Sequence, residues 1–339
     1  MSLHLPEPTH TPLRGHAVLR WGVLAPGAIA NSWVGAVHEH TDQRVVAVAS
    51  RSLEKAQQFA TTHGIERAYG TYEQLVADVD VDIVYIAAQH SEHRRLALLA
   101  IAAGKHVLVE KPIGVNAAEA RDIASAAAAA GVFAMEAMWS RFLPQTTIVA
   151  RLLEEGALGD LFLVTADFGD LFPFDPTSRA FDPALGGGAM LDIGVYPGWF
   201  SHFVLGKPER VTASGSLAVT GVDAQAVVIL DHAAGAQSVV TTTMLAQTTQ
   251  AASISGTTGR IELAGAFFAP GSLRFTSGGE SVEWHDPTGF SWGEGLCYQA
   301  AAVAATIADG MLQSPLHTLD DTIEVLEMID EVRSQLGAK

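Results

Sequence analysis

The chain has 339 residues, of which 20 are basic and 37 acidic, so its formal net charge is −17 at pH 7. Such an acidic chain is poorly suited to nucleic acids or anionic membranes, because both bind proteins largely through Lys and Arg. Hydrophobic residues make up 48% of the chain, which is enough for a sizeable core and excludes a disordered protein. The single cysteine, Cys297, excludes intramolecular disulfides and cysteine-rich zinc sites, and it fits a cytoplasmic location.

Residues 1–17 are expected to form a flexible tail, because they contain three prolines and three histidines but no apolar run. The same composition excludes a secretory signal peptide. No stretch of the chain approaches the roughly 18 consecutive apolar residues of a membrane-spanning helix. We therefore expect a chain that does not contact membranes.

Residues 18–142 alternate between short apolar runs and segments whose apolar residues recur at helical spacing. This alternation predicts a parallel sheet covered by helices on both faces, which is the doubly wound Rossmann fold of dinucleotide-binding domains. Asn116, with Glu119 three residues later, predicts a capping box at the start of the last helix. The expected strands are 19–24, 44–49, 82–87, 106–110 and 132–137, and the expected helices are 28–37, 53–64, 91–103 and 116–131.

Residues 143–339 show a different pattern, in which apolar residues recur at every second position between glycine-rich turns. This period predicts a large, open, mostly antiparallel sheet in an α+β domain for substrate binding and oligomerisation. The chain is therefore expected to be an α/β protein of two domains, with the boundary near residues 141–144. The expected strands are 161–168, 210–219, 226–230, 238–245, 252–255, 260–263, 273–276 and 281–284, and the expected helices are 145–154, 296–310 and 319–336.

The first motif is a turn of small residues that follows the first expected strand and opens the first expected helix. Small residues there let the backbone approach a pyrophosphate at the N-terminus of the helix. Ala25 and Ala30 fill positions that often hold glycine. An ordinary tight turn would have a similar composition, but the place between strand and helix favours dinucleotide binding. The expected contacts are Gly22, Ala25, Pro26, Gly27, Ala28 and Ile29.

A second cluster follows the next strand, where NAD-dependent enzymes place an acidic residue against the ribose hydroxyls. This chain has no acidic residue there; Ser50, Arg51 and Ser52 follow the strand, and Lys55 comes shortly after. A guanidinium can bind a 2′-phosphate and stack on adenine, and serine hydroxyls can donate hydrogen bonds. These residues favour NADP over NAD. In the alternative interpretation Ser52 caps a helix and Arg51 is only solvated.

Two further motifs carry groups that can move a proton. Glu110, Lys111 and Pro112 follow a predicted strand, at the carboxyl end where such folds bind ligands. Asp192 and Tyr196 stand four residues apart in a glycine-rich segment, so in one continuous helix they would share a face. Taken singly, each motif is explained better without a function. The first would be a surface lysine in a turn, and the second a glycine-rich turn followed by a packing tyrosine.

Together the motifs resemble the glucose–fructose oxidoreductase/inositol dehydrogenase (Gfo/Idh/MocA) family. The resemblance covers about residues 20–336, and it is specific for the set of motifs rather than for any one of them. It is nearest the branch that contains trans-1,2-dihydrobenzene-1,2-diol dehydrogenases and NADP-dependent D-xylose dehydrogenases. Additional matches are Met135–Pro144, Ser178 with Arg179, Phe181–Pro183 and Gly186–Tyr196.

The resemblance implies catalytic roles for three residues. Lys111 matches the catalytic lysine of the family's Glu-Lys-Pro motif, with a cis peptide bond before Pro112. Tyr196 stands where many members have histidine and where the dihydrodiol and xylose branch has tyrosine, so it would be the general acid/base. Asp192 would help to hold the substrate. A lysine ammonium beside the phenol would favour the phenolate that takes the proton of an alcohol.

The resemblance also implies further contacts with the nucleotide. Trp139 and Arg141 match residues that line the cofactor, and Gln299 stands where many relatives have an acid. The remaining expected contacts follow two strands of the parallel sheet and are Ala88, His90, His93, Glu110, Lys111 and Pro112.

The sequence thus predicts an NADP-dependent oxidoreductase, with NAD as the alternative cofactor. It would transfer hydride between the nicotinamide and a secondary alcohol or carbonyl of a sugar, cyclic polyol or dihydrodiol. The alternative is a non-catalytic sensor or regulator that keeps the fold and binds NAD(P); the presence of both Lys111 and Tyr196 favours the enzyme. No metal is expected, because His90 and His93 have no acidic partner at ligand spacing.

The expected open sheet also bears on assembly. Residues 226–230 are apolar on more than one face of their strand, which fits a sheet that packs against its twin in a second copy of the chain. The resemblance implies this face-to-face packing, and closed symmetric dimers are the commonest oligomers. We expect a homodimer, or a tetramer built from it. The alternative is a sheet covered only by the chain's own helices.

Overall fold

The structure is a computed structural model that describes residues 3–339; Met1 and Ser2, at the start of the expected tail, lie outside the described residues. The chain forms two compact units. The parallel-sheet unit consists of His10–Phe142 and Phe290–Ile323. The large-sheet unit consists of the residues up to Thr9, Leu143–Gly289 and Glu324–Lys339.

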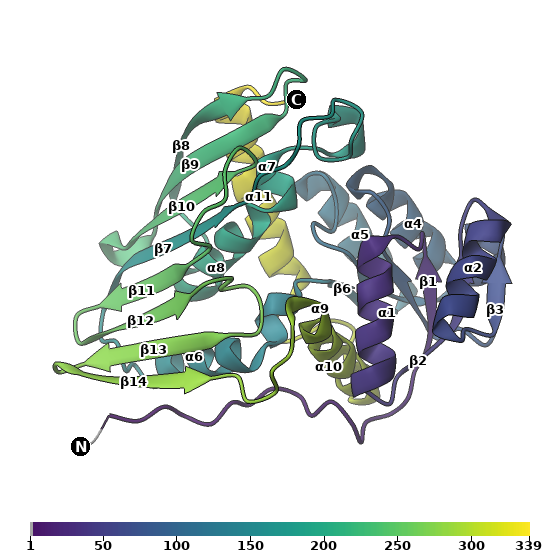
Figure 1. Ribbon diagram of the computed structural model, residues 1–339, viewed down its shortest axis with the longest axis horizontal. Helices are drawn as coiled ribbons and strands as arrows, with labels where there is room; N and C mark the ends of the chain where they lie inside the picture. The colour runs from purple at the N-terminus through teal and green to yellow at the C-terminus, as the bar shows by residue number, and fades with distance from the viewer. Residues whose placement is uncertain (1–2) are drawn as a thin grey trace. The chain divides into compact units, whose positions relative to one another are not determined.

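The parallel-sheet unit contains six parallel strands in the order β3-β2-β1-β4-β5-β6, and each strand is joined to the next along the chain by a helix (Figure 1). This is the expected doubly wound topology. The strands are β1 (Arg20–Leu24), β2 (Arg44–Ala49), β3 (Arg67–Tyr69), β4 (Ile83–Ile86), β5 (His106–Val109) and β6 (Ala134–Glu136). The helices between them are α1 (Ala28–His40), α2 (Leu53–His63), α3 (Tyr72–Val76), α4 (His90–Ala102) and α5 (Ala117–Ala130).

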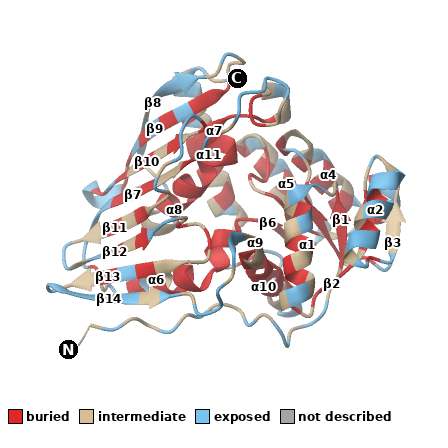
Figure 2. Cartoon of the chain, in the orientation of Figure 1, coloured by how far each residue is buried: buried red, intermediate tan, exposed pale blue. Residues whose placement is uncertain are grey.

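Local sequence accounts for most of these elements. The central strands β1, β4 and β5 are almost entirely buried, which is why their apolar runs are continuous (Figure 2). Helices α2 and α5 end at Gly64 and Gly131, whose φ angles of 66° and 65° lie in the left-handed region that glycine adopts without steric cost. Apolar runs therefore mark the strands, and these glycines mark where two of the helices stop.

The start of α5 differs from the expected capping box in one hydrogen bond. Asn116 Oδ1 accepts from the backbone amide of Glu119 at 2.9 Å, as expected. The Glu119 carboxylate accepts from the amide of Val115 at 3.0 Å, one residue before the amide that a capping box would use. Gly114 allows this approach, because a Cβ there would lie 2.8 Å from the Cβ of Glu119.

The strand β3 and the helix α3, at one edge of the sheet, are not among the expected elements. β3 has only three residues, all half-buried, so it shows no pattern of alternation. It is held by Asp78, whose carboxylate accepts from Arg67 Nε at 2.8 Å and from the Tyr69 hydroxyl at 3.0 Å. Side-chain contacts of this kind leave no periodic pattern in the sequence.

Residues 290–323, which the sequence assigns to the second domain, cluster with the parallel-sheet unit instead. The helices α9 (Trp292–Gly295) and α10 (Cys297–Ala308) pack against α1. The chain then runs beside β6, where the carbonyl of Leu312 accepts from the amide of Ala134 at 3.1 Å. Helical periodicity predicts that such a segment is helical, but it does not predict which core the helix joins.

The expected flexible tail is an extended segment fixed at several points. It has no regular secondary structure, in keeping with its lack of an apolar pattern. The amide of Thr9 donates to Thr147 Oγ1 at 2.9 Å within the large-sheet unit. Within the parallel-sheet unit, Arg14 pairs with one oxygen of Asp42 at 3.2 Å, and the other oxygen accepts from the amide of Gly15 at 2.8 Å.

The large-sheet unit contains eight strands in the order β14-β13-β12-β11-β7-β10-β9-β8 (Figure 1). The sheet is mostly antiparallel, as expected, but β7 and β10 pair in parallel. The strands are β7 (Leu161–Gly169), β8 (Arg210–Leu217), β9 (Asp223–Asp231), β10 (Gln237–Thr243), β11 (Ala252–Gly256), β12 (Gly259–Ala264), β13 (Ser272–Ser277) and β14 (Glu280–His285). The helices are α6 (Pro144–Glu154), α7 (Ala189–Asp192), α8 (Val195–Leu205) and α11 (Leu319–Leu336), of which α11 begins in the parallel-sheet unit.

Residues alternate along these strands between a buried face and a more open one (Figure 2). On β9, Val228 is buried, whereas its neighbours Val227 and Ile229 are 50% and 42% exposed. Helix α8 covers the buried face, where the hydroxyl of Ser201 donates to that of Ser238 at 2.7 Å. The period of two thus predicts the strands correctly and leaves apolar side chains on the open face.

Candidate active site

The turn after β1 has the geometry of a phosphate-binding turn. Ala25 has a φ of 61°, in the left-handed region that glycine favours, and its amide donates to the carbonyl of Ala49 at 3.0 Å. Gly27 precedes α1 and makes no side-chain cap, and both Gly27 and Ala28 are exposed. The first amides of α1 and the positive end of the helix dipole therefore suit an anion.

Gly22 also lies where a side chain would not fit. It is buried in the middle of β1 rather than placed in the turn. A Cβ there would lie 2.7 Å from Cδ2 of Leu75 and 3.1 Å from Cγ1 of Val81. The absence of a side chain at Gly22 thus allows β1 to pack closely against its neighbours.

Two basic side chains are available at the carboxyl end of β2. Arg51 and Lys55 are exposed, and neither side chain makes a hydrogen bond or ion pair with another residue in the described part of the chain. Ser52 caps α2, with its hydroxyl accepting from the amide of Lys55 at 3.4 Å, and its own amide donates to Ser50 Oγ at 3.3 Å. The two serines shape this turn, and the two cations face solvent.

Lys111 lies on a turn after β5 whose peptide bond to Pro112 is cis, as the resemblance implies. The preceding residue, Glu110, is only 5% exposed. One oxygen of its carboxyl group accepts from the Tyr85 hydroxyl at 2.5 Å, and the other accepts from the Lys111 amide at 3.1 Å. Burial raises the pKa of Glu110, against the opposing effects of the Tyr85 hydrogen bond and the Lys111 charge. Glu110 therefore holds the turn from within the core.

His93 is completely buried and joins the turns that follow β4 and β5. Its Nδ1 lies 2.7 Å from the carbonyl oxygen of Pro112, and its Nε2 lies 3.0 Å from that of Ala88. Burial lowers the pKa of His93 and favours the neutral ring, although both carbonyls oppose this effect. A neutral ring donates only one hydrogen bond, and the shorter distance assigns that bond to Pro112. The adjacent His90, 4% exposed, has its ring centroid 5.7 Å away.

The next two expected cofactor residues lie on the short 3-10 helix η1 (Trp139–Phe142). Trp139 is 2% exposed, with its ring centroid 6.3 Å from that of Trp292. Arg141 Nε donates to the carbonyl of Leu316 at 2.8 Å. Both residues therefore contact the segment that returns to this unit after Phe290. Gln299, on α10, is fully buried, and its amide atoms have no hydrogen-bond partner among the described residues.

In the large-sheet unit, Asp192 and Tyr196 do not share one helix, which corrects the expected spacing argument. Helix α7 ends at Asp192, and α8 begins at Val195 with Gly194 as its N-cap. A Cβ on Gly194 would lie 2.8 Å from Cα of Met190, so only glycine fits at this tight break. The glycine ends one helix and starts the next.

Asp192 and Tyr196 are each held by neighbouring side chains. Asp192 Oδ2 accepts from Arg179 Nη2 at 2.9 Å, and the Asp192 side chain is only 7% exposed. The Tyr196 ring lies 5.6 Å from that of Phe168 and 5.0 Å from that of Phe268, and these two rings stack at 4.1 Å. An ion-paired carboxylate and a phenol against an aromatic wall thus belong to the same short segment.

Asp223, the first residue of β9, anchors the segment that carries Asp192 and Tyr196. Its carboxyl group is fully buried; Oδ2 accepts from the amide of Met190 at 2.6 Å, and Oδ1 has no partner among the described residues. Gly188, with a φ of 120°, has no room for a side chain, because a Cβ would lie 2.3 Å from Asp223 Oδ1. Burial raises the pKa of Asp223 to about 6, although the Met190 amide opposes the shift.

Three buried ionisable residues beside these turns are not among the expected site residues: Glu136, Asp223 and His317. Glu136 has a signal in the sequence, since it is an acidic residue inside an otherwise apolar predicted strand and such residues are rarely buried without a partner. Asp223 and His317 have no such signal. The sequence shows which residues are acidic or basic, but their partners become visible only in the fold.

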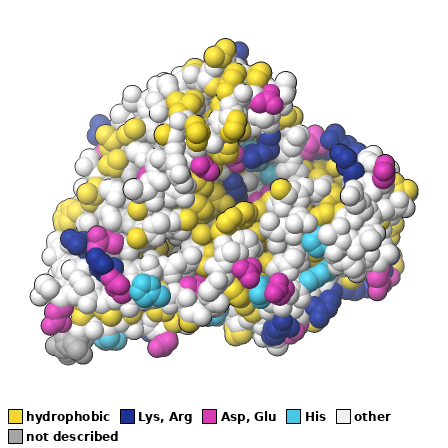
Figure 3. All heavy atoms as spheres, viewed as in Figure 1, with side chains coloured by type: hydrophobic (Ala, Val, Ile, Leu, Met, Phe, Trp, Pro, Cys, Tyr) yellow, Lys and Arg dark blue, Asp and Glu magenta, His cyan; other side chains and the backbone are white. Residues whose placement is uncertain are grey.

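In residues 3–339, no group of three His, Cys, Asp or Glu side chains is placed to hold a metal ion. The same range contains no helix whose length and hydropathy would allow it to cross a membrane. On the face drawn in Figure 3, Lys and Arg side chains lie in small groups among acidic and uncharged ones. This face therefore has no continuous basic surface of the kind that polyanions bind.

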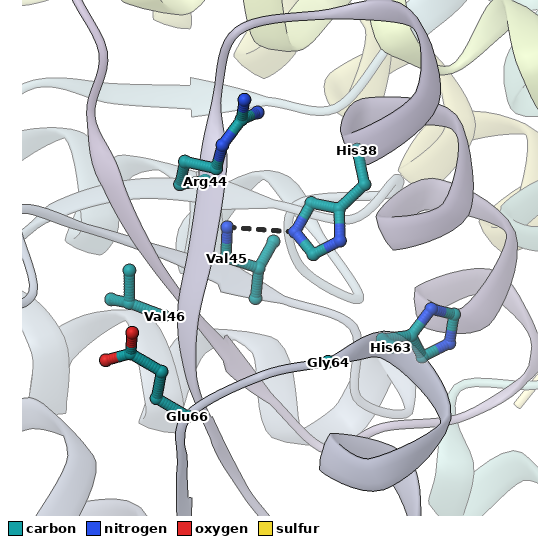
Figure 4. A pocket seen from close by; sticks show the side chains of 7 residues that line it. All are labelled: His38, Arg44, Val45, Val46, His63, Gly64 and Glu66. Carbon is teal, nitrogen blue, oxygen red and sulfur yellow. Dashed lines mark hydrogen bonds between the residues drawn. The ribbon is translucent and has the colours of Figure 1, made fainter.

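A surface hollow of about 360 Å³ lies at the amino end of β2, where Arg44 and Val45 line it (Figure 4). His38 and His63 line it, and His38 Nε2 accepts from the amide of Val45 at 3.1 Å. Burial lowers the pKa of His38, in keeping with an imidazole nitrogen that accepts a hydrogen bond. Doubly wound sheets bind ligands at the carboxyl ends of their strands, so this hollow is not the dinucleotide site.

The topology and the turns after β1 and β5 define the class of protein, an oxidoreductase that binds a nicotinamide dinucleotide. Residues 19–138 match the model of an oxidoreductase family with an NAD-binding Rossmann fold, and residues 147–262 match that of the GFO/IDH/MocA C-terminal domain. The chain belongs to the Gfo/Idh/MocA family, as its motifs predict. It is an NAD(P)-dependent oxidoreductase.

The curated relatives include trans-1,2-dihydrobenzene-1,2-diol dehydrogenases. The protein from Xenopus laevis is 39% identical over 326 residues, which cover 94% of this chain and 98% of the relative. The protein from Homo sapiens is 37% identical over 328 residues, with coverage of 94% and 97%. These similarities extend over both units of the chain.

Solved structures with the same fold include two with bound nucleotides. A 3-ketoreductase from Actinomadura kijaniata, in complex with NADP and TDP-benzene, has a TM-score of 0.80 and 25% identity, with coverage of 94% and 98%. Levoglucosan dehydrogenase, in complex with NADH and levoglucosan, has a TM-score of 0.87 and 21% identity, with coverage of 94% and 97%. The second comparison shows a shared fold.

The raised pKa of Asp223 predicts how stability depends on pH. Because the folded state holds this proton more tightly, the group's contribution is fully present below its ordinary pKa of 3.8 and is lost as the pH rises through about 6. Asp223→Asn keeps an acceptor for Met190 and cannot ionise. We expect this variant to be more stable than the wild type at pH 8, by at most ~3 kcal/mol, and the two to converge near pH 4. Urea unfolding at pH 4, 6 and 8 measures the difference.

The matched control is Asp170→Asn, because Asp170 is an exposed carboxylate in the same unit. It should leave the pH dependence unchanged. If the free energy of unfolding depended on pH in the same way in the wild type and in Asp223→Asn, the assignment of a strained, buried carboxylate at this position would be contradicted.

Proposed function

We propose that the protein is an NADP-dependent dehydrogenase that acts on a secondary alcohol, or the corresponding carbonyl, of a sugar, cyclic polyol or dihydrodiol. One observation carries this proposal: the exposed N-terminus of α1 and the turn of Lys111 follow strands β1 and β5, at the edge of the sheet where such folds bind ligands. The similarity to dihydrodiol dehydrogenases supports the substrate class. A reducing, cytoplasmic location suits the free, buried thiol of Cys297.

The residues present fit a nicotinamide dinucleotide phosphate. The first amides of α1 have no side-chain cap, and Ala25 has the backbone conformation that lets a turn approach a pyrophosphate. Arg51 and Lys55 offer positive charge at the position where an acidic residue would select NAD. When the nucleotide is bound, its nicotinamide ring accepts or returns a hydride.

Proton transfer is assigned to side chains of the chain itself. As the alcohol is oxidised, its hydroxyl proton passes to the phenolate of Tyr196 while the carbinol carbon loses a hydride, which leaves a carbonyl. In the opposite direction the Tyr196 phenol returns the proton to the carbonyl oxygen. The Lys111 ammonium favours the phenolate, and Asp192, held by Arg179, accepts a hydrogen bond from a second substrate hydroxyl.

Replacement of Tyr196 by phenylalanine tests the proposed acid/base. Tyr196→Phe keeps the aromatic packing and removes the phenolic oxygen, so we expect kcat to fall about 10²–10⁴-fold. The KM and the Kd for NADP should change less than about threefold, because ground-state binding is retained. NADP reduction with a panel of pentoses, hexoses, cyclic polyols and dihydrodiols provides the measurement.

Tyr298→Phe is the control, because Tyr298 lies on α10 and packs against His10 and Phe290, residues with no part in the proposed site. Full activity of Tyr196→Phe would exclude the assigned role. Tight NADP binding by the wild type with no turnover on any substrate of the panel would indicate a sensor instead of an enzyme.

Replacement of Arg51 tests the choice of nucleotide. The Arg51→Ala variant should raise the Kd for NADP about 10- to 100-fold, since it removes charged hydrogen bonds to a 2′-phosphate. The Kd for NAD should change less than about twofold, because NAD lacks that phosphate. Nucleotide titrations followed by protein fluorescence measure both constants. Arg94→Ala removes a partly exposed arginine of α4, paired with Asp122, as a control. An equal loss for both nucleotides in Arg51→Ala would refute the 2′-phosphate contact.

We also propose that two copies of the chain form a homodimer through the open faces of their large sheets, with a tetramer as the larger assembly. The open face carries neighbouring apolar side chains: Val227 and Ile229 on β9 are 50% and 42% exposed, and Leu163 on β7 is 39% exposed. On the intervening strand, Val239 lies opposite Ile229 and Gln237 lies opposite Leu163. Burial of this row against its twin would stabilise a symmetric pair.

A charge placed on this face tests the dimer. Val227→Arg should convert the dimer to a monomer, because the symmetry brings two arginines into one apolar interface. Sedimentation equilibrium measures the mass. Val79→Arg, at an 83% exposed valine of the parallel-sheet unit, should leave the mass unchanged. A monomeric wild type would contradict the proposal directly.

A further inference from the structure

The turn that carries Lys111 is held by three buried side chains from three different elements. Glu110 accepts from the Lys111 amide, and His93, on α4, bonds to the carbonyl of Pro112. The third is Glu136, at the end of β6, whose Oε1 accepts from the amide of Ile113 at 2.9 Å. These supports fix consecutive residues of the turn. Among the described residues, Glu110 and His93 make no further hydrogen bond with a distant part of the chain, whereas the other oxygen of Glu136 is bound by residues near the C-terminal helix.

The second oxygen of Glu136 is bound by residues that follow α10. His317 Nε2 lies 2.9 Å from Glu136 Oε2, and the Thr322 hydroxyl donates to the same oxygen at 3.3 Å. Thr322 Oγ1 and His317 Nε2 are themselves 3.1 Å apart. The side chains of Glu136 and His317 are each 2% exposed, so this hydrogen bond is shielded from water. The Glu136 carboxylate therefore links the Lys111 turn to a segment that lies 181 residues after Glu136 in the chain.

The contacts of Glu136 identify it as a charged acceptor. Ile113 offers an amide, Thr322 a hydroxyl and His317 a ring N–H, so the carboxylate receives only donors, which an ionised group requires. Its charge reaches the turn, since it raises the pKa of both Glu110 and His93, although burial dominates each pKa. The two groups on which it acts are the other two supports of the turn.

The segment that supplies His317 is itself attached at two further points. Leu312 accepts from the amide of Ala134 at 3.1 Å, and Leu316 accepts from Arg141 Nε at 2.8 Å. The segment thus lies along β6 and η1 as a brace and ends in α11. His317 is the point at which the brace meets the carboxylate that holds the turn.

We propose that Glu136 and His317 are positioning residues for Lys111: the buried pair fixes the Lys111–Ile113 turn to the brace at residues 311–318. The proposal rests on the assignment of Lys111 to the reaction. Neither residue reaches the substrate; each acts through the backbone of the turn and through the charge that Glu136 places beside it. A small displacement of a group that must be aligned with a reacting atom can reduce the rate about a hundredfold.

The first experiment compares variants of the full chain by steady-state kinetics. His317→Leu removes the donor, and Glu136→Gln keeps the shape but removes the charge; we expect kcat to fall about 10- to 100-fold in each. The Kd for NADP should stay within about threefold, because the pyrophosphate turn and Arg51 are untouched. His317→Gln places an amide donor near the position of Nε2 and should recover at least half of the wild-type kcat.

A second measurement reads Lys111 directly and needs no turnover. The chain has only five lysines, so reductive methylation with ¹³C-formaldehyde gives few resonances, and Lys111→Arg assigns the one from Lys111. In Glu136→Gln and His317→Leu the chemical shift of this resonance should change. Its titration midpoint in Glu136→Gln should shift to lower pH, because the buried anion that holds the turn of Lys111 has been removed.

The control for a merely structural effect is His232→Leu. His232 is a buried histidine of the large-sheet unit whose ring bonds to the hydroxyls of Ser201 and Ser238. This variant should lose stability and leave kcat and the Lys111 resonance unchanged. If Glu136→Gln and His317→Leu behave like His232→Leu, the proposal is overturned.

The two measurements separate the failure of this inference from that of the proposed function. A wild type without turnover would remove the assigned reaction, yet the Lys111 resonance would still report whether the pair positions the turn. A reduced kcat with an unchanged Lys111 resonance and titration would show that the pair acts elsewhere, and it would overturn the inference while leaving the dehydrogenase in place.

Discussion

A carboxylate withdrawn from water must receive hydrogen bonds at its oxygens, and this constraint governs the turn of Lys111. Glu110 and Glu136 are both buried, and each has one oxygen on a backbone amide of the turn. The strands β5 and β6, which end at this turn and at Glu136, are fixed by the parallel ladder. The position of the turn is therefore set by the register of the sheet and by the hydrogen bonds that two buried carboxylates must receive. The sequence of the turn itself contributes less.

The same sheet edge explains how an acidic chain can hold an anionic nucleotide. The backbone amides at the start of α1 attract phosphate groups without any charged side chain. The site therefore needs few basic residues, although the chain has a net charge of −17. Ala25 has a left-handed backbone conformation, which glycine would adopt without strain. The rest of the fold therefore stabilises the shape of this turn against a modest conformational cost at Ala25. In the proposed site, positive charge is supplied by Arg51, Lys55, Lys111 and Arg141.

Much of the fold could be predicted because its signals are local and periodic. The limits of β2 and α11 agree with the expected ranges to the residue, since alternation and helical spacing run unbroken through both. The Glu110–Pro112 motif could be placed at the end of a strand for the same reason. The spacing of Gly22 predicts a phosphate-binding turn, and the structure adds a packing constraint at the same residue, because a Cβ there would meet Leu75. Spacing alone does not distinguish these two uses of glycine.

What the sequence could not predict are contacts between distant residues. The break at Gly194 depends on the backbone of Met190, and the burial of Glu136 depends on His317 much later in the chain. Asp223 and Gly188 meet only because β9 passes beneath α7. Such pairs leave no period in the sequence, so the supports of the site are visible only once the fold is known.

The return of the chain to the parallel-sheet unit affects the order in which the protein becomes structured during synthesis. The amide of Ala134 and the carboxylate of Glu136 find their partners at Leu312 and His317. At typical ribosome speeds these partners appear roughly 10–40 s after β6. Until then water must satisfy both groups, and the large sheet is made in the interval. Helix α11 contributes to both units, and its residue Thr322 binds the Glu136 carboxylate. The turn of Lys111 therefore gains its last support only as this final helix leaves the ribosome.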